Sequence, residues 1–459
     1  MKYGKSLFLA AALALLASCG SKDNIIRTRI PARPAGQEDA VALRVAPLDT
    51  VRVGFIGLGM RGPGAVERFC YLDRTRIVAL CDVLPENVEA SRQILLRHGR
   101  PDAAAYSGSE DAWKALCERD DINLVYIATD WKTHAPMALY AMEHGKHVTI
   151  EVPAATSLDE IWALINMAES KRLHCMMLEN CVYDFFELTT LNMAQKGVFG
   201  DIIHAEGAYN HCLDEFWDRY WNSWRLDFNA AHKGDIYPTH GLGPVCQVLN
   251  IHRGDRMKTL VAMETRSVVG KKLWAKRGHN PSEFQNGDET MTMIETEKGN
   301  TILIEHDVMT PRPYNRMYQV VGTEGYASKY PIQIYSLHPE RQEGVVSHEN
   351  LNAHRPVSKE VMQAMQEKYR SPILTPELEA LAKEVGGHGG MDFIMDYRLV
   401  YCLLNGLPLD MDVYDLAEWC CLGELGAISI ANGGAPVEVP DFTRGAWNRI
   451  DGYNYAFAE

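Results

Sequence analysis

The sequence predicts an α/β protein with two domains: a parallel sheet covered by helices, then an α+β domain with an open, largely antiparallel sheet. Two observations predict this architecture. Between residues 50 and 184, short apolar runs alternate with amphipathic helical stretches, which is typical of parallel sheets. After residue 185, strand patterns follow one another across tight turns, which is typical of antiparallel sheets.

Length, composition and charge exclude several classes of protein. The chain has 459 residues, enough for two or three domains with their own cores. Apolar residues make up 46% and charged residues 23%, as in ordinary globular proteins and unlike disordered or fibrous ones. The net charge of −14 repels phosphate backbones, so we expect no nucleic-acid partner.

Residues 1–18 have the pattern of a bacterial lipoprotein signal peptide. Two lysines precede an apolar run over residues 7–16, which is too short to span a bilayer as a helix. Leu-Ala-Ser before Cys19 resembles a lipobox, whose cysteine is lipidated; the alternatives are an uncleaved anchor or a chance cysteine. We expect a lipoprotein exported by a Gram-negative bacterium and anchored through Cys19, on the periplasmic or cell-surface side. Residues 19–49 are polar and lack a period, so we interpret them as a tether.

The remaining ten cysteines do not predict a disulfide framework. Several lie in or beside apolar runs, where buried thiols are common, and two are adjacent in a helical stretch. No C-x-x-C pair or His/Cys cluster has the spacing of a zinc site, so we predict no metal.

A glycine-rich turn follows the first strand, residues 51–56, and opens a helix. Gly57, Gly59 and Gly62 have the G-x-G-x-x-G spacing in the context that this motif requires. The first glycine permits a tight turn, the second lets the backbone approach a pyrophosphate, and the third allows helix and strand to pack closely. We therefore predict a Rossmann dinucleotide-binding domain over residues 50–184.

An acidic residue sets the preferred dinucleotide. The second strand, residues 76–81, ends in Asp82, about 20 residues beyond the third glycine of the motif. A carboxylate at this position accepts hydrogen bonds from ribose hydroxyls and repels a 2′-phosphate. The predicted cofactor is therefore NAD.

Further elements follow in alternation, and the residues after each strand are candidate ligand contacts. We predict helices at 111–119, 135–144 and 158–171 and strands at 123–129, 146–150 and 174–178. Ligands bind outside the carboxyl ends of such strands, where the loop of residues 129–134, the turn of residues 151–153 and Asn180 fall. Asn180 is placed to reach the nicotinamide ribose or ring. For Asn180 and His134, the alternative is a helix cap or a local loop hydrogen bond.

The second half, residues 185–459, is predicted to bind the substrate. Residues 202–210 and 318–321 form strand patterns, and a hairpin joins 290–296 to 301–308. Open sheets of this kind often dimerise, which makes a homo-oligomer a candidate assembly. Between these strands lie groups that stack on sugar rings and bind hydroxyls, or that form an amphipathic packing segment. They are Tyr209, His211, Trp217, Tyr220, Trp221, Trp224 and Arg225.

Two further segments carry groups for proton transfer. A glycine-flanked turn over residues 234–243 opens a helix and places Tyr237 close to His240, although a single histidine is more often structural. The proline-flanked turn before Tyr314 presents this phenol to the same region; Tyr318 is the near alternative, and ordinary turn chemistry is the other.

These motifs together resemble the glucose-fructose oxidoreductase / inositol dehydrogenase superfamily. The resemblance covers residues 50–450 and is strongest to glycoside hydrolase family 109, the NAD-dependent α-N-acetylgalactosaminidases. Dehydrogenases of the superfamily carry Glu-Lys-Pro where this chain has Glu151-Val152-Pro153, so the lysine that they use at the substrate hydroxyl is missing. The departure disfavours a plain dehydrogenase and agrees with the glycosidase family.

The resemblance implies site residues for the cofactor and for a sugar. NAD would contact Gly57, Gly59, Met60, Arg61, Gly62, Asp82, Trp131, Lys132, Thr133, His134, Glu151, Val152 and Asn180. The sugar, a terminal N-acetylgalactosamine of a glycan or small molecule, would contact Tyr209, Arg225, Tyr237, Pro238, Thr239, His240 and Tyr314. Tyr237 and His240 are the catalytic candidates for the proton transfers at C2 and C3, with the division between them unassigned.

The implied reaction is redox-neutral. Hydride passes from C3 of the sugar to NAD, the C2 proton leaves, the C1 aglycone is eliminated, water adds, and the hydride returns. This route needs no pair of catalytic carboxylates. The alternatives are a net NAD-dependent sugar or cyclitol dehydrogenase and a catalytically inert sugar-binding lipoprotein.

Overall fold

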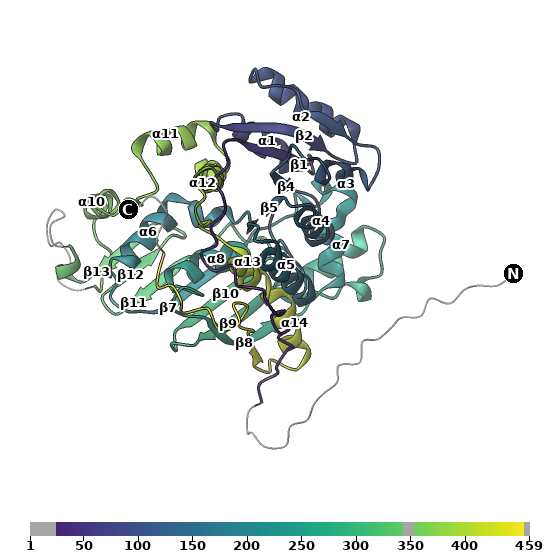
Figure 1. The fold of residues 1–459 in the computed structure, drawn as a ribbon. Coiled ribbons are helices and arrows are strands. Elements are labelled where there is room, and N and C mark those ends of the chain that lie inside the picture. Colours follow the sequence, from purple (N-terminus) through teal and green to yellow (C-terminus); the bar gives the residue numbers. More distant parts are fainter. Residues whose placement is uncertain (1–23, 343–352, 454–459) are drawn as a thin grey trace.

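A computed structural model describes residues 24–342 and 353–453 (Figure 1). The predicted signal peptide and Cys19 lie outside these residues. In the described part of the chain, no helix has the length and apolar character needed to cross a membrane. The ten cysteines in the same ranges are all free thiols.

The first domain is a six-stranded parallel sheet, ordered β3-β2-β1-β4-β5-β6 (Figure 1). Its central strands β4 and β5 are buried along their whole length, which explains their continuous apolar patterns. The strands are β1 Val51–Ile56, β2 Thr75–Cys81, β3 Ala104–Tyr106, β4 Leu124–Ile127, β5 His147–Ile150 and β6 Cys175–Met177. The helices are α1 Gly62–Phe69, α2 Pro85–Arg97, α3 Ala112–Cys117, α4 Trp131–Glu143 and α5 Leu158–Lys171. The predicted Rossmann fold is confirmed.

Helix α4 starts four residues earlier than the predicted helix at Ala135, and this corrects the position of one predicted loop. The side chain of Asp130 accepts hydrogen bonds from the backbone N–H groups of Lys132 and Thr133. This cap satisfies donors that a helix start leaves unpaired, so the helix begins at Trp131. Trp131 to His134 therefore form its first turn.

The second domain is an eight-stranded sheet, ordered β13-β12-β11-β7-β10-β9-β8-β14. Only β7 and β10 pair in parallel; the other six pairings are antiparallel, so the predicted sheet is confirmed. The strands are β7 Ile202–Asn210, β8 Met257–Glu264, β9 Thr290–Thr296, β10 Thr301–Asp307, β11 Gln319–Gly322, β12 Gly325–Ser328, β13 Ile334–Leu337 and β14 Val437–Glu438.

Helices of the second half of the chain connect these strands; some cover the second sheet and others pack on the first domain (Figure 1). They are α6 Phe185–Gln195, α7 Trp224–Ala231, α8 Thr239–Val248, α9 Val269–Lys276, α10 Lys359–Lys368, α11 Pro376–Val385, α12 Met391–Asn405, α13 Val413–Cys420 and α14 Leu422–Ala431. The described residues also include six short 3-10 turns: η1 Asn180–Tyr183, η2 Trp217–Arg219, η3 Trp221–Ser223, η4 Pro281–Glu283, η5 Pro339–Gln342 and η6 His388–Gly390. Helix α8 packs closely on β7, because a Cβ on Gly207 would lie 2.2 Å from the carbonyl oxygen of Gly241.

Residues 24–49 are not a free tether, which corrects the sequence interpretation for this part of the chain. Ile26 bridges to Val437 of β14, and Arg33 forms an ion pair of 3.0 Å with Glu169 of α5. Further on, the backbone N–H of Leu48 donates to the carbonyl of Leu403 at 3.0 Å. The segment thus runs along both domains before it enters β1 (Figure 1). Its partners are remote in sequence, so no local pattern indicates its burial.

The C-terminal chain returns to the first domain. Arg68 of α1 donates to Asp396 of α12 at 2.6 Å, and both side chains are buried. Helix α12 is preceded by the turn of residues 386–390, in which each residue has a positive φ. This return brings residues of the last quarter of the chain to the glycine-rich loop.

Candidate active site

The glycine-rich loop after β1 is built to approach a ligand closely. Gly57 has φ +90°, and a Cβ there would lie 2.5 Å from the carbonyl oxygen of Ala128. A Cβ on Gly62 would lie 2.1 Å from the carbonyl oxygen of Gly57, whereas one on Gly59 would meet nothing within 4 Å. The first and third glycines are therefore required by packing, and the second faces open space. This arrangement fits a bound pyrophosphate.

Asp82 follows β2 and lies beside this loop. Its Oδ2 accepts a hydrogen bond of 2.7 Å from the backbone N–H of Leu58, and its Oδ1 accepts from Leu84 and Asn87. Each carboxylate oxygen has two lone pairs, so Asp82 holds the loop and retains acceptor capacity for ribose hydroxyls.

Arg61 joins the loop to two acidic side chains from distant elements. Its guanidinium lies 3.0 Å from Glu151, after β5, and 3.2 Å from Asp392 of α12. Asn180 donates to the same Asp392 carboxylate at 2.5 Å, and the His388 ring lies 3.0 Å from it. Burial alone would raise the pKa of Asp392, but His388 and the nearby arginines hold it well below its ordinary value. The neighbouring Met60 is 49% exposed.

The first turn of α4 positions the turn after β5. Trp131 donates from Nε1 to the carbonyl oxygen of Val152 at 3.1 Å. His134 is buried between two carbonyl oxygens, with Nδ1 2.8 Å from Pro153 and Nε2 3.1 Å from Thr129. Burial lowers its pKa, so the ring is neutral. These contacts agree with the alternative interpretation of His134 as a residue that makes structural hydrogen bonds. Lys132, in the same turn, is exposed.

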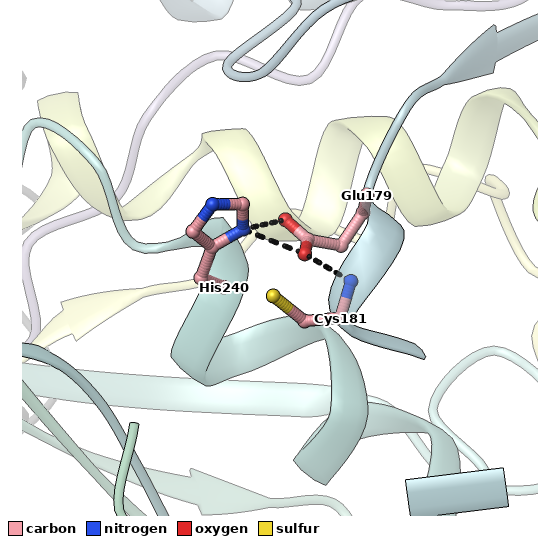
Figure 2. A group of neighbouring side chains, drawn as sticks. All are labelled: Glu179, Cys181 and His240. Atoms are coloured by element: carbon pink, nitrogen blue, oxygen red, sulfur yellow. Dashed lines mark hydrogen bonds and ion pairs between the residues drawn. The ribbon is translucent and has the colours of Figure 1, made fainter. Parts of the chain in front are cut away.

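Glu179, His240 and Tyr237 form a hydrogen-bonded series. Nδ1 of His240 lies 2.7 Å from Oε1 of Glu179, and Nε2 lies 3.1 Å from the hydroxyl of Tyr237. Figure 2 shows the His240 ring and the Glu179 carboxylate pointing toward one another from separate elements. A carboxylate at Nδ1 fixes the tautomer that carries its proton there and leaves Nε2 as the acceptor for the phenol.

The electrostatics agree with this assignment. Burial alone would raise the pKa of Glu179, but His240 and further hydrogen bonds hold it below its ordinary value, so it is a carboxylate. Burial and the neighbouring Tyr209 raise the pKa of Tyr237 well above its ordinary value, so it is a phenol. The hydrogen bond to Nε2 gives the Tyr237 proton a direct acceptor in His240, whose imidazolium form would pair with Glu179.

Two groups of side chains bring potential metal ligands together, which the sequence spacing did not indicate. The ligand atoms of Glu179, Cys181 and His240 lie within 4.8 Å of one another (Figure 2). Burial raises the pKa of the Cys181 thiol well above its ordinary value, and the other two residues share a hydrogen bond, so the three side chains form a hydrogen-bonded pair beside a protonated thiol. In the second group, His252, Asp412 and Asp415, the guanidinium of Arg253 pairs with Asp415 at 2.8 Å.

Aromatic rings surround the predicted sugar-binding residues. Tyr209 lies 4.7 Å from the Tyr237 ring, and its hydroxyl lies 2.9 Å from Nδ1 of His211. Burial lowers the pKa of His211 to about 4, so this second phenol–imidazole pair contains a neutral ring. Tyr314 is 42% exposed and its ring lies 5.1 Å from His211. Tyr318, the alternative, is buried at 2% exposure away from these rings, against Phe186.

Pro238 and Thr239 form the start of α8, and Thr239 is fully buried. Their position orients the helix that carries His240.

The sequence did not predict Glu179, His388 or Asp392 as site residues. The glycine-rich run around His388 is the signal by which two of them could have been found, since such a run allows a chain to approach a ligand.

The fold and the site define a protein that combines a dinucleotide-binding loop with a carboxylate–imidazole–phenol series lined by aromatic rings. Residues 51–179 match the family described as "Oxidoreductase family, NAD-binding Rossmann fold", and residues 183–449 match "Glycosyl hydrolase 109, C-terminal domain". The chain belongs to glycosyl hydrolase family 109, and its first domain is an NAD-binding Rossmann fold.

Full-length relatives belong to the same family, and a solved structure has the same fold. "Glycosyl hydrolase family 109 protein 1" of Bacteroides thetaiotaomicron is 65% identical over 96% of this chain and 94% of its own. "Glycosyl hydrolase family 109 protein" of Porphyromonas gingivalis is 62% identical over 100% of both chains. The solved structure "Levoglucosan dehydrogenase, complex with NADH and levoglucosan" is 18% identical with a TM-score of 0.63, covering 85% of this chain and 100% of that one; it shows the fold.

Proposed function

We propose that this protein hydrolyses terminal α-N-acetylgalactosaminides in a redox-neutral reaction that uses NAD. The observation that carries the proposal is the series Glu179–His240–Tyr237 beside the glycine-rich loop. Because this series moves protons and the loop fits a dinucleotide, the site supports hydride and proton transfer at a sugar hydroxyl.

The acids of the site support this route over direct hydrolysis by a carboxylate pair. Glu151 pairs with Arg61, Asp392 pairs with Arg61 and Asn180, and Glu179 pairs with His240. Each of the three carboxylates is thus engaged by a donor or a cation. Hydrolysis by the usual route needs one carboxylic acid and one free carboxylate facing the glycosidic bond.

The residues present fit NAD. Gly57, Gly59 and Gly62 would lie against its pyrophosphate, Asp82 would bind its adenosine ribose, and Asn180 and Glu151 would lie on its nicotinamide side. When bound, NAD supplies an acceptor for hydride from a sugar carbon and a donor that returns it.

The chain supplies the proton transfers. Tyr237 accepts a proton from the sugar hydroxyl while its own proton passes to Nε2 of His240, 3.1 Å away. Glu179 stabilises the imidazolium that forms. The neutral His211, paired with Tyr209, gives the site a second phenol–imidazole pair, which matches a reaction that moves protons at both C2 and C3.

The experiment uses protein that lacks the first 19 residues, p-nitrophenyl α-N-acetylgalactosaminide, and NAD present or absent. We expect release of p-nitrophenol that requires NAD, without net NADH. Exchange of the C2 hydrogen with deuterated water should accompany it. Accumulation of NADH without cleavage would identify a dehydrogenase instead, and sugar binding without either signal would identify an inert binding protein.

We also propose that the protein is an exported lipoprotein, on the strength of residues 1–19. Lipidation at Cys19 would place the glycosidase at a membrane, where a glycan substrate is presented from outside the cytoplasm.

A further inference from the structure

Arg225 of α7 is a buried cation without an acidic partner. Its residue is 6% exposed, and among the described residues it forms no ion pair. Its Nη1 donates to the hydroxyl of Tyr220 at 2.5 Å, while its buried Nε has no hydrogen-bond partner. Burying a charge without a counterion costs several kcal/mol. A cation buried at this cost indicates a site in which negative charge develops during the reaction.

Four aromatic rings surround this guanidinium. Its central carbon lies 4.7 Å from the ring centre of Tyr237, 5.1 Å from Trp131, 5.2 Å from Tyr220 and 5.9 Å from Tyr209. Burial opposes its charge, but the surrounding phenols raise its pKa above the ordinary value, so it remains a cation. The ring nearest to it, Tyr237, is the one that donates to His240.

Trp131 also connects this guanidinium to the turn of residues 151–153. Trp131 stacks on Tyr237 with ring centres 5.6 Å apart, and its indole donates to the carbonyl oxygen of Val152. The residue in the middle of Glu151-Val152-Pro153 is therefore connected through Trp131 to Arg225.

We propose that Arg225 supplies the positive charge that stabilises negative charge on the oxygen of Tyr237 and on the sugar oxygen during the reaction. The proposal rests on the proposed function. In the oxidation step, the sugar O–H bond breaks and its proton bonds to the Tyr237 oxygen. The Tyr237 proton bonds to Nε2 of His240, and the C–H electron pair leaves as hydride to the oxidised nicotinamide. Negative charge that develops on the two oxygens faces Arg225.

The other charged and titratable groups around Tyr237 do not replace this charge. They are Tyr209 of β7, His240 of α8, Asp235 before α8, Glu179 after β6, Glu151 after β5 and Arg61 before α1. Arg61 is already paired with Glu151 at 3.0 Å, and Glu179 is a carboxylate. Loss of Arg225 would leave Tyr237 facing an excess of negative charge, which raises the pH at which its proton can be given up.

The test compares Arg225→Gln, Arg225→Lys and the control Arg219→Gln in the protein assayed above. Arg219 is an exposed arginine that also lies over an aromatic ring, Phe216, at 4.9 Å. We expect Arg225→Gln to lower kcat about 10²-fold or more, with KM changed far less and NAD affinity retained. Its rate should rise toward higher pH than that of the unmodified protein. Arg225→Lys should recover most of kcat, and Arg219→Gln should match the unmodified protein.

If Arg225→Gln lacks the circular dichroism of the unmodified protein, Arg225→Lys decides the question through its kcat and pH profile.

A rise in KM with unchanged kcat and pH profile would overturn the proposal, because Arg225 would then only bind the sugar. So would an Arg225→Lys variant as inactive as Arg225→Gln, since shape and not charge would then matter. Failure of the proposed function is a separate result: the unmodified protein would itself release no p-nitrophenol.

Discussion

Glu179 and His240, 61 residues apart in sequence, share a hydrogen bond of 2.7 Å at the edge where the two domains meet. Glu179 follows the last strand of the parallel sheet, and His240 lies in the first turn of α8, which packs on the second sheet. Each domain therefore contributes one partner. The proton-transfer series exists only when both domains are folded together.

Glu179→Gln should lower turnover on the order of 10²- to 10⁴-fold, because an amide neither enforces the same His240 tautomer nor stabilises the imidazolium. Turnover of p-nitrophenyl α-N-acetylgalactosaminide and NAD affinity would be measured together. NAD should still bind, and His240→Ala should be at least as inactive. Full activity in either variant would contradict the roles assigned to this pair.

Asp82→Asn should weaken NAD binding about 10-fold or more and reduce the preference for NAD over NADP, because the charge that repels a 2′-phosphate is lost. Binding of both dinucleotides by fluorescence titration measures this. Asp82 also accepts from the backbone N–H of Leu58 at 2.7 Å, so thermal stability must be recorded as a control. If a folded Asp82→Asn variant kept the same preference for NAD over NADP, Asp82 would not be a cofactor contact.

Glu169→Gln should lower the free energy of unfolding near neutral pH by about 3 kcal/mol or more, because it breaks a buried ion pair. Glu169 accepts from Arg33, Gln37, Tyr414 and Arg444, at 2.6 to 3.1 Å. Urea unfolding measures the change. An effect within experimental error would show that residues 24–49 do not stabilise the fold through this contact.

The same contact predicts a pH dependence. Burial alone would raise the pKa of Glu169, but Arg33, Tyr414 and Gln37 hold it below its ordinary value of 4.5. A lowered carboxyl pKa in the folded state gives stability that is present above the unfolded value and is lost as pH falls through the folded value. The free energy of unfolding of the unmodified protein should therefore approach that of Glu169→Gln as the pH falls below about 4.5.

Cys19→Ser should abolish incorporation of labelled palmitate and release the protein from the membrane fraction, since the lipobox cysteine is the proposed acceptor. Cys212→Ser is the matched control, because Cys212 is the partly exposed thiol of the described residues and should leave labelling unchanged. Labelling that persists in Cys19→Ser would exclude this anchor.

Local patterns in the sequence determined the elements and the motifs. The glycine-rich loop, Asp82, the strand of residues 202–210 and the hairpin of β9 and β10 all depend on neighbours within a few residues, so periodicity and turn chemistry predict them. Tyr237 and His240, three residues apart at the start of α8, were likewise predicted to lie together, and they do.

Only the tertiary structure decided which remote groups complete the site and which segments are buried. Glu179 meets His240, and Asp392 meets Arg61 and Asn180, through packing between the domains and the return of α12. Residues 24–49 are held by partners such as Glu169 that are over a hundred residues away. A side chain's charge partner is set by where distant elements pack, and one sequence contains no local trace of that contact.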